Sequence, residues 1–311
     1  MIEILLGTFN GGAFLEQQIN SILEQTYHDW RMIIRDDGST DNTVNIIEGY
    51  IEKYPNKFTL IISENASGSA KNNFMRLIQD ANADYVMFCD QDDFWEPDKI
   101  QLTYNMLLQL EEEYKSSTPI LVHTDLVVAD EQLEVIGSSF FDYMNLPRKK
   151  ELKDLIIQNS ITGCTVMINK SLLELMKRLE ENGPILMHDH VAGILASIFG
   201  KVGLVDKPMI KYRQHGLNSV GASDANSMNY KVNRFKRGKA TFKKDMEASY
   251  EQMDYLLKIY DVSVCDSLTQ EMINKYSQLS QKSKLGKISF FIQYRVLKHG
   301  LIRKVVQLLW A

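Results

Sequence analysis

The sequence predicts an α/β protein in which a doubly wound, Rossmann-like sheet is followed by a helical appendage. Two observations predict the sheet: short apolar runs alternate with segments of helical apolar spacing, and the runs are apolar on both faces. A third predicts the appendage, because the pattern is helical from Tyr230 onward. We therefore expect an enzyme-sized domain over residues 1–225 and a basic helical region over residues 226–311.

Four apolar runs predict the first strands, at Ile2–Leu6, Arg31–Arg35, Phe58–Ile62 and Tyr85–Cys89. Helices are expected between them, from Phe14 to Thr26, from Thr40 or Asp41 to the residue before Pro55, and over Ala70–Ala81. Thr40 or Asp41 can cap its helix because either side chain accepts a hydrogen bond from a free backbone N–H. Strands joined by helices in this order form a parallel sheet.

The second half of the chain is less regular. It predicts a strand at Ile120–Val128, a helix after Lys170, another over Asp189–Phe199, and two strands at Val202–Val205 and Met209–Tyr212. We expect these elements to complete the same sheet, with the boundary to the helical region near residues 222–230.

Composition excludes several classes of protein. Hydrophobic residues make up 44% of the 311 residues, which argues against a disordered or fibrous chain. The cysteines, Cys89, Cys164 and Cys265, form no C-x-x-C pair, so neither a disulfide framework nor a structural zinc site is expected. Glu3 interrupts the first apolar run, and no stretch reaches roughly 18 uncharged apolar residues. We therefore expect a cytoplasmic protein without a signal peptide or a spanning helix.

The net charge of −5 hides an acidic body and a basic tail. From Asn229 to Ala311 there are 16 Lys and Arg against 7 Asp and Glu, and no acidic residue follows Glu271. The acidic body argues against a nucleic-acid partner. Cations interleave with apolar residues between Phe290 and Trp310, as in an amphipathic helix on the anionic inner face of the cell membrane. Helices packed on their own core with a solvated basic face would show the same pattern.

Polar residues follow each of the first four predicted strands. Because ligands of open α/β sheets bind beyond the carboxyl ends of the strands, these residues should point at one crevice. The groups are Thr8-Phe9-Asn10, Asp36-Asp37-Gly38-Ser39-Thr40-Asp41, Asn65-Ala66-Ser67-Gly68 and Asp90-Gln91-Asp92-Asp93. The second group fits an ordinary turn and helix cap, but its carboxylates could equally accept hydrogen bonds from a pyrimidine N–H or ribose hydroxyls.

Three aspartates, Asp90, Asp92 and Asp93, crowd together directly after an apolar strand. Like charges at this spacing repel one another unless a cation lies between them. Oxygen ligands suit Mn²⁺ or Mg²⁺, and either ion can bridge a diphosphate. A solvated acidic turn is the alternative interpretation.

Together these groups resemble the inverting family 2 glycosyltransferases, which have the GT-A fold. The resemblance covers residues 1–220 and depends on the order and spacing of the groups, with Trp95 and Pro97 following the last of them. It implies roles for the matching positions: Thr8 and Asp37 at the nucleotide base, Asp36 or Asp37 at the uracil or thymine edge, Asp90 at the ribose and Asp92 at the metal. Asn10 is expected among the residues that bind the nucleotide sugar.

Two later clusters extend the resemblance to the acceptor side. His188-Asp189-His190 opens a predicted helix and could simply cap it, but in the family the acidic residue here is the general base. The positive end of the helix should keep the Asp189 carboxylate ionised. Tyr212-Arg213-Gln214-His215 resembles a motif of bacterial rhamnosyltransferases, which implies a diphosphate contact for Arg213 and a metal ligand in His215. A histidine at a strand end is otherwise more often structural.

The resemblance implies a metal-dependent enzyme that moves rhamnose from dTDP-rhamnose, or a hexose from a UDP-sugar, to a glycan or lipid-linked glycan of a surface polysaccharide. Asp189 would take the acceptor proton during direct displacement at the anomeric carbon. One alternative is a non-catalytic scaffold that binds nucleotide sugars, although a scaffold needs no base at Asp189. Another is a metal-dependent hydrolase, which the lack of a second set of metal ligands disfavours.

Overall fold

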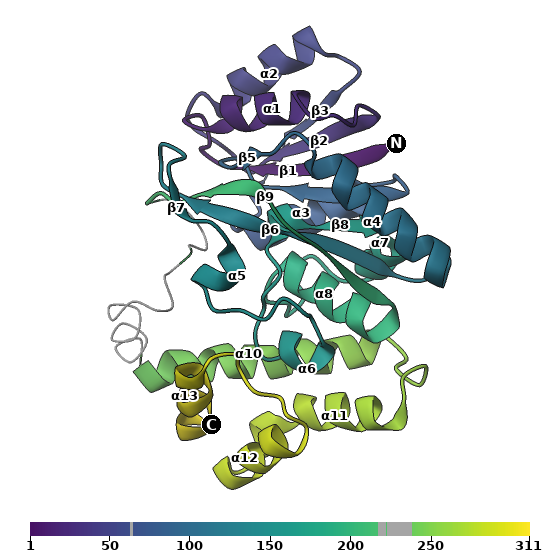
Figure 1. Cartoon of the computed structure of the whole chain (residues 1–311), viewed down its shortest axis with the longest axis vertical. Coiled ribbons are helices and arrows are strands. Elements are labelled where there is room, and N and C mark those ends of the chain that lie inside the picture. Colours follow the sequence, from purple (N-terminus) through teal and green to yellow (C-terminus); the bar gives the residue numbers. More distant parts are fainter. Residues whose placement is uncertain (63–64, 217–221, 223–237) are drawn as a thin grey trace.

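The computed structural model describes residues 1–62, 65–216, 222 and 238–311. Within them, a nine-stranded sheet has the order β3-β2-β1-β4-β8-β6-β9-β5, with β7 paired to β6 (Figure 1). The strands are β1 (Ile2–Thr8), β2 (Trp30–Asp36), β3 (Phe58–Ile62), β4 (Tyr85–Cys89), β5 (Phe94–Trp95), β6 (Ile120–Ala129), β7 (Val135–Gly137), β8 (Met167–Asn169) and β9 (Lys201–Arg213). The predicted α/β fold class and the first four strands are confirmed.

The four N-terminal strands are parallel and in close register. Thr8 pairs with Asp36 at the carboxyl ends of β1 and β2, and Leu6 pairs with Cys89 at the end of β4. The polar groups that follow these strands therefore emerge side by side at one edge of the sheet, as the sequence predicts.

The second half of the sheet departs from the predicted parallel order. β8 is antiparallel to both β4 and β6, and β5 is antiparallel to β9. The prediction of a wholly parallel sheet is wrong here because an apolar run does not encode the direction of its strand. β9 is also one strand rather than two, since the polar stretch around Asp206 lies where the register against β6 shifts after Thr124.

Helices cover both faces of the sheet. One face carries α1 (Leu15–Leu23), α2 (Thr43–Lys53) and α4 (Lys99–Tyr114); the other carries α3 (Ala70–Asp80), α7 (Lys170–Met176) and α8 (His188–Phe199). Along β1, the side chains of Ile4 and Leu6 pack in the core under α1, α2 and α4, and that of Leu5 packs in the core under α3, α7 and α8. α4 was not predicted, because two of its four buried side chains, Lys99 and Thr103, are polar and break the apolar spacing of a helix.

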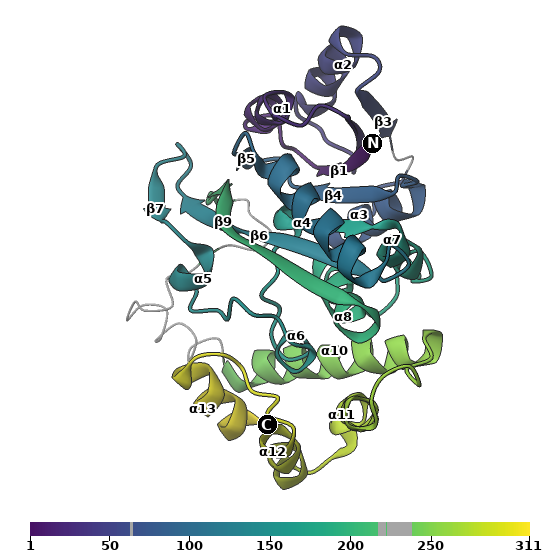
Figure 2. The same ribbon diagram turned by 45° about the vertical axis from the view of Figure 1, so that its right-hand side comes forward.

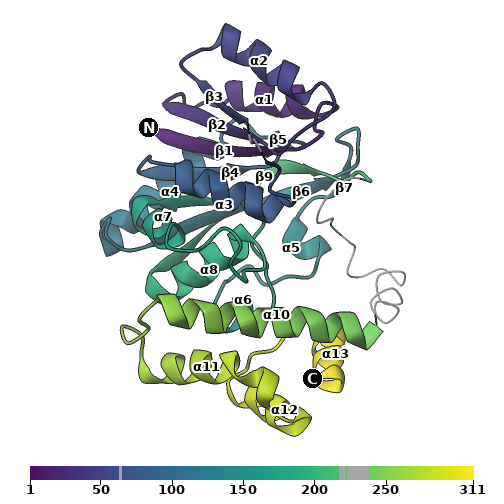
Figure 3. The ribbon, with the colours of Figure 1, turned by 180° about the vertical axis from the view of Figure 1, so that it is seen from behind.

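Two short helices, α5 (Phe140–Tyr143) and α6 (Leu152–Leu155), lie in the segment between β7 and β8, which ends in a 3₁₀ turn at Gly163–Thr165. The C-terminal helices α10 (Gly238–Ile259), α11 (Ser267–Ser277), α12 (Lys284–Gln293) and α13 (Leu301–Trp310) pack beneath α6 and α8 (Figures 2 and 3).

The C-terminal helices share a hydrophobic core with the sheet. Tyr250 and Phe291 belong to the same buried cluster as Leu5 of β1, and the Tyr276 hydroxyl donates a hydrogen bond to the Ile156 carbonyl at 2.8 Å. The C-terminal helices therefore pack against the rest of the protein through their buried faces. The predicted boundary between residues 225 and 226 lies outside the described residues. In the described part, no helix has the length and apolar character needed to cross a membrane.

Candidate active site

A cavity of about 820 Å³ opens at the carboxyl ends of β1 and β4 and extends toward the C-terminal helices. Five of the nine predicted site residues line it: Thr8, Asp37, Asp90, Asp92 and Asp189. The other four, Asn10, Asp36, Arg213 and His215, lie behind or beside its wall. The structure thus brings the base candidate and the strand-end carboxylates to one cavity.

The two neighbouring aspartates at the end of β2 have different surroundings. Asp36 is buried and accepts hydrogen bonds from the Thr8 hydroxyl at 2.9 Å and from the backbone N–H groups of Gly38 and Ser39 at 3.0 and 2.8 Å. Asp37 lines the cavity and accepts from the N–H of Gly68 at 3.2 Å. Of the two, Asp37 is therefore placed to meet a ligand, whereas Asp36 holds the loop in shape.

Asn10 also serves the loop rather than the cavity. Its backbone has a positive φ of 47°, which asparagine tolerates better than most residues. Its N–H donates to the Ser39 hydroxyl at 2.8 Å, and its side-chain oxygen accepts from the N–H of Thr40 at 2.8 Å. Asn10 thus ties the loop after β1 to the loop after β2.

The loop after β4 divides its three aspartates between two environments. Asp90 and Asp92 line the cavity, while Asp93 is fully buried and accepts a hydrogen bond from the N–H of Arg213 at 3.1 Å. Burial raises the pKa of Asp90 to about 7, and the charges of Asp92 and Asp189 contribute to that rise. A divalent cation at this loop would offset that repulsion.

Two sets of side chains could hold such a cation. The Asp92 carboxylate lies 2.8 Å from Nε2 of His215, and the His215 ring packs on Phe14 at 4.7 Å. Ligand atoms of Asp90, Asp93 and Cys164 also lie within 4.8 Å of one another. The first set offers a carboxylate and an imidazole beside the cavity, which suits Mn²⁺ or Mg²⁺ with a diphosphate better than the second, which includes a buried thiol with a raised pKa.

Arg213 faces protein groups rather than the cavity. Its guanidinium donates to the backbone carbonyl of Asp92 at 2.8 Å, to the carbonyl of Glu131 and to the side chain of Gln17. The expected contact with a diphosphate stays a prediction; in this structure three other segments engage the guanidinium. Arg213 instead fixes the backbone from which Asp92 projects.

Asp189 lies in the first turn of α8, with its side chain in the cavity wall. Its carboxylate accepts hydrogen bonds from Asn159 at 3.1 Å and from the N–H of His190. Burial nevertheless raises its pKa to about 7, so the expectation that the helix terminus keeps it fully ionised is wrong. The desolvation outweighs the hydrogen bonds and the helix terminus. A carboxylate with this pKa is well suited to accept a proton near neutral pH.

The wall of the cavity that lies away from the strand ends was not predicted from the sequence. It includes Phe140 and Met144 of the α5 region, Gln158 and Asn159 before β8, and two cations, Lys298 and Arg303, from the C-terminal segment. One local signal was available: Ser139 followed three residues later by Asp142 is a helix-start pattern, and the Ser139 hydroxyl caps α5.

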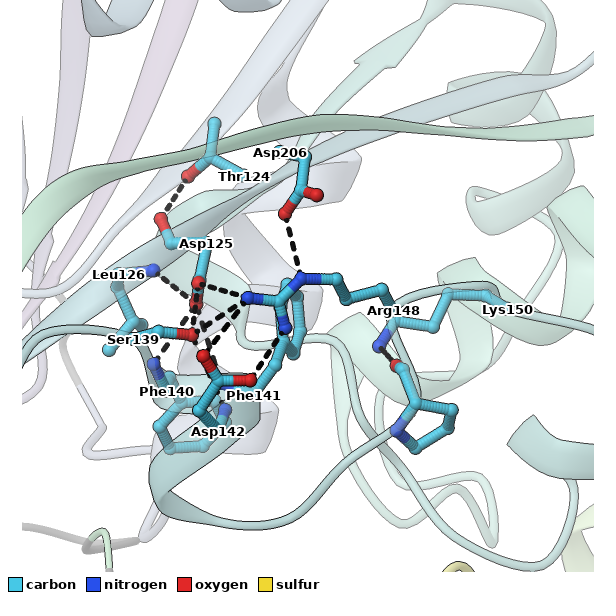
Figure 4. Close-up of polar contacts among 11 residues, drawn as sticks. Thr124, Asp125, Leu126, Ser139, Phe140, Phe141, Asp142, Arg148, Lys150 and Asp206 are labelled. Carbon is cyan, nitrogen blue, oxygen red and sulfur yellow. Dashed lines mark hydrogen bonds and ion pairs between the residues drawn. The ribbon is translucent and has the colours of Figure 1, made fainter.

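Asp125 anchors this wall from the sheet side (Figure 4). It is buried in β6 and accepts hydrogen bonds from the Ser139 hydroxyl at 2.5 Å and from the N–H of Phe140 at 3.1 Å. Arg148 folds over it and pairs with Asp142 at 2.9 Å and Asp206 at 3.1 Å. The start of α5, and with it the Phe140 side chain in the cavity, is thereby held against the sheet.

The model of the glycosyl transferase family 2 matches residues 3–176. The dTDP-rhamnosyl transferase RfbG of Shigella flexneri is 33% identical over 235 residues, which are 73% of this chain and 77% of RfbG. WfgD of Escherichia coli, a UDP-Glc:α-D-GlcNAc-diphosphoundecaprenol β-1,3-glucosyltransferase, is 24% identical over 56% of this chain and 62% of its own.

Two solved structures have a similar fold. TarS 1–349 of S. aureus in complex with UDP matches with a TM-score of 0.59 and 16% identity, over 95% of this chain and 82% of that one. The mannosyltransferase PcManGT from Pyrobaculum calidifontis, in complex with GDP-Man and Mn²⁺, matches with a TM-score of 0.53 and 16% identity, over 92% of this chain and 71% of that one.

Proposed function

The chain belongs to glycosyltransferase family 2, and from this premise we propose that it transfers rhamnose from dTDP-rhamnose, with inversion, to a lipid-linked glycan of a surface polysaccharide. The family membership confirms the resemblance drawn from the strand-end groups. The similarity to RfbG, a dTDP-rhamnosyl transferase, supports dTDP-rhamnose as the donor. The diphosphoundecaprenol acceptor named for WfgD supports a lipid-linked acceptor. A hexose from a UDP-sugar is the second candidate donor.

The observation that carries the proposal is the placement of Asp189 in the same cavity as Asp37, Asp90 and Asp92. In the proposed reaction, Asp189 accepts the proton of the acceptor hydroxyl while that oxygen bonds to the anomeric carbon. The bond from this carbon to the nucleoside diphosphate breaks in the same step. Mn²⁺ or Mg²⁺ held by Asp92, with His215 beside it, would neutralise charge on the departing diphosphate. A scaffold subunit would have no use for Asp189 at this position.

A panel of dTDP- and UDP-sugars, scored by melting temperature with Mn²⁺ and with chelator, tests the donor. A donor at about 100 times its dissociation constant should stabilise the protein by about 2.7 kcal/mol. We expect dTDP-rhamnose to give the largest shift, and only with metal. Stabilisation by a UDP-hexose alone would assign the second donor. Stabilisation without any sugar release or transfer would favour the scaffold instead.

We also propose that the protein lies on an anionic membrane surface through α13. Leu301, Val305 and Leu309 are spaced four residues apart along one side of this helix and are 78%, 44% and 53% exposed. Val306, on the other side, is buried in the core, and Lys304 lies beside the exposed stripe. An apolar stripe flanked by cations is the pattern of a helix that rests in the headgroup region.

Replacing both exposed leucines, Leu301→Ser with Leu309→Ser, should weaken binding to phosphatidylglycerol vesicles by at least about tenfold, because each leucine buried in lipid contributes about 1.5 kcal/mol. Vesicle co-sedimentation measures this. Val135→Ser, which removes an exposed apolar residue of β7, is the matched control and should bind as the unchanged protein does. Absence of vesicle binding by the unchanged protein, or binding that salt does not weaken, would contradict the proposal.

A further inference from the structure

The charged side chains that line the cavity are separated by sign. Among the described residues, the acidic ones are Asp37, Asp90, Asp92 and Asp189, at or near the strand ends, and the basic ones are Lys298 and Arg303. Both cations come from the C-terminal segment, which lies at the opposite end of the ribbon from β1 (Figure 1). The nucleotide end and the far end therefore offer opposite charges to a ligand.

A continuous set of contacts connects the base to this cationic end. Asn159 donates to the Asp189 carboxylate at 3.1 Å, and its neighbour Gln158 accepts a hydrogen bond from the N–H of His299 at 2.9 Å. Lys298 immediately precedes His299, and its charge helps to lower the pKa of the buried His190, after the larger effect of burial. Lys298 thus lies within electrostatic reach of the residue next to the base.

Arg303 and Lys298 differ in their burial and in their contacts. The buried guanidinium of Arg303 donates to the carbonyls of Met144 at 2.7 Å and Asn145 at 2.8 Å, directly after α5. At the other end of α5, the Asp125 carboxylate of β6 accepts a hydrogen bond from the N–H of Phe140 (Figure 4), so this part of the wall is held at both ends of the helix. Lys298 is only partly buried and lies in the loop between α12 and α13. The Lys298 ammonium lies 5.4 Å from the centroid of the Phe242 ring. Lys298 is the more exposed of the two cations, so it is the better placed to meet a ligand in the cavity.

We propose that Lys298 binds an anionic phosphate group of the acceptor, on the side of the acceptor away from the hydroxyl that Asp189 deprotonates. The inference deepens the proposed function, since it assigns a residue to the phosphate of a phosphorylated glycan acceptor. The donor diphosphate belongs to the opposite, metal-binding end, so the two phosphates do not compete. A charge-assisted hydrogen bond from an ammonium in a partly enclosed site is the physical basis of the contact.

Decyl phosphate serves as the probe, with decyl glucoside as its neutral counterpart, in the presence of saturating dTDP and Mg²⁺. Lys298→Gln should bind decyl phosphate about tenfold more weakly, which corresponds to about 1.4 kcal/mol, while its affinity for decyl glucoside and dTDP stays unchanged. Lys258→Gln, the same change at an exposed cation of α10 outside the cavity, is the matched control and should retain decyl phosphate binding.

An equal loss of affinity for decyl phosphate in the two variants would overturn the proposal, since general electrostatic attraction would then explain the binding. The proposal also fails if Lys298→Gln weakens binding to phosphatidylglycerol vesicles as strongly as it weakens binding to decyl phosphate, because Lys298 would then contact lipid headgroups. Failure of the unchanged protein to bind decyl phosphate, with sugar transfer intact, would refute this inference and leave the proposed function standing. Unchanged melting temperatures identify the effect as binding rather than misfolding.

Discussion

Asp189→Asn is expected to lower the rate of sugar transfer by about 10² to 10⁴ while donor affinity changes little, because general-base assistance is typically worth that much. The amide keeps the shape of the carboxylate and can still meet Asn159, but it cannot accept the acceptor proton. Single-turnover transfer and nucleotide affinity, measured on the same preparation, separate the two effects. Near-normal transfer would remove Asp189 from the mechanism, whereas lost nucleotide binding would give it a structural role.

The pH dependence of sugar transfer provides an independent test of the role of Asp189. Since burial raises the pKa of Asp189 to about 7, transfer by the unchanged protein should fall as pH decreases through 7, and the residual activity of Asp189→Asn should lack this inflection. A raised carboxyl pKa stabilises the folded state at low pH, and that stability is lost as pH rises between about 4 and 7. Above pH 7 the variant should therefore melt no lower than the unchanged protein. A clear drop in melting temperature would indicate a structural role.

Asp92→Asn is expected to abolish the metal dependence of nucleoside diphosphate affinity. Groups that only orient a metal ligand are worth about 10- to 100-fold in metal affinity, so removing a proposed ligand should cost at least as much. The fold should survive, because the change relieves repulsion from Asp90 and an amide can still meet His215. Calorimetry of dTDP binding with Mn²⁺ and with chelator measures the effect.

Asp98→Asn is the matched control for Asp92, because Asp98 lies six positions further along the chain, is exposed and does not line the cavity. It should keep the full difference between metal and chelator. If the unchanged protein binds dTDP equally well in both conditions, the carboxylates of this loop do not act through a metal.

The part of the site at the strand ends could be predicted because each of its residues is marked by its immediate neighbours in the sequence. Thr8, Asp37 and Asp90 each lie within two residues of the end of a predicted strand, and the parallel register of β1, β2 and β4 brings such positions together. The choice between Asp36 and Asp37 could not be made from sequence, since adjacent residues differ only in which backbone N–H groups they meet. The protein contacts of Arg213 could not be predicted for a related reason: a guanidinium that can bind phosphate oxygens can also bind three protein oxygens.

The acceptor end could not be predicted because it is assembled from distant segments. His299, and with it Lys298, comes to Gln158 only through the packing of the C-terminal helices on α6 and α8, and no spacing in the sequence records that contact. The tail posed a similar problem, since Phe291 in the core and Leu301 on the surface belong to one apolar pattern. Burial separates them, and burial depends on the fold as a whole.

Packing of the C-terminal helices on the sheet has a consequence for the order in which the enzyme becomes competent during synthesis. The ribosome releases β1, β2 and β4, with their carboxylates, long before Lys298 and Arg303 exist. The proposed donor side is incomplete at that stage, because Arg213 and His215, which contact Asp92, are translated later. The wall proposed to receive the acceptor is complete only when Arg303 of α13 bonds to the carbonyls behind α5. A chain interrupted before that point would carry the strand-end carboxylates but lack this part of the wall.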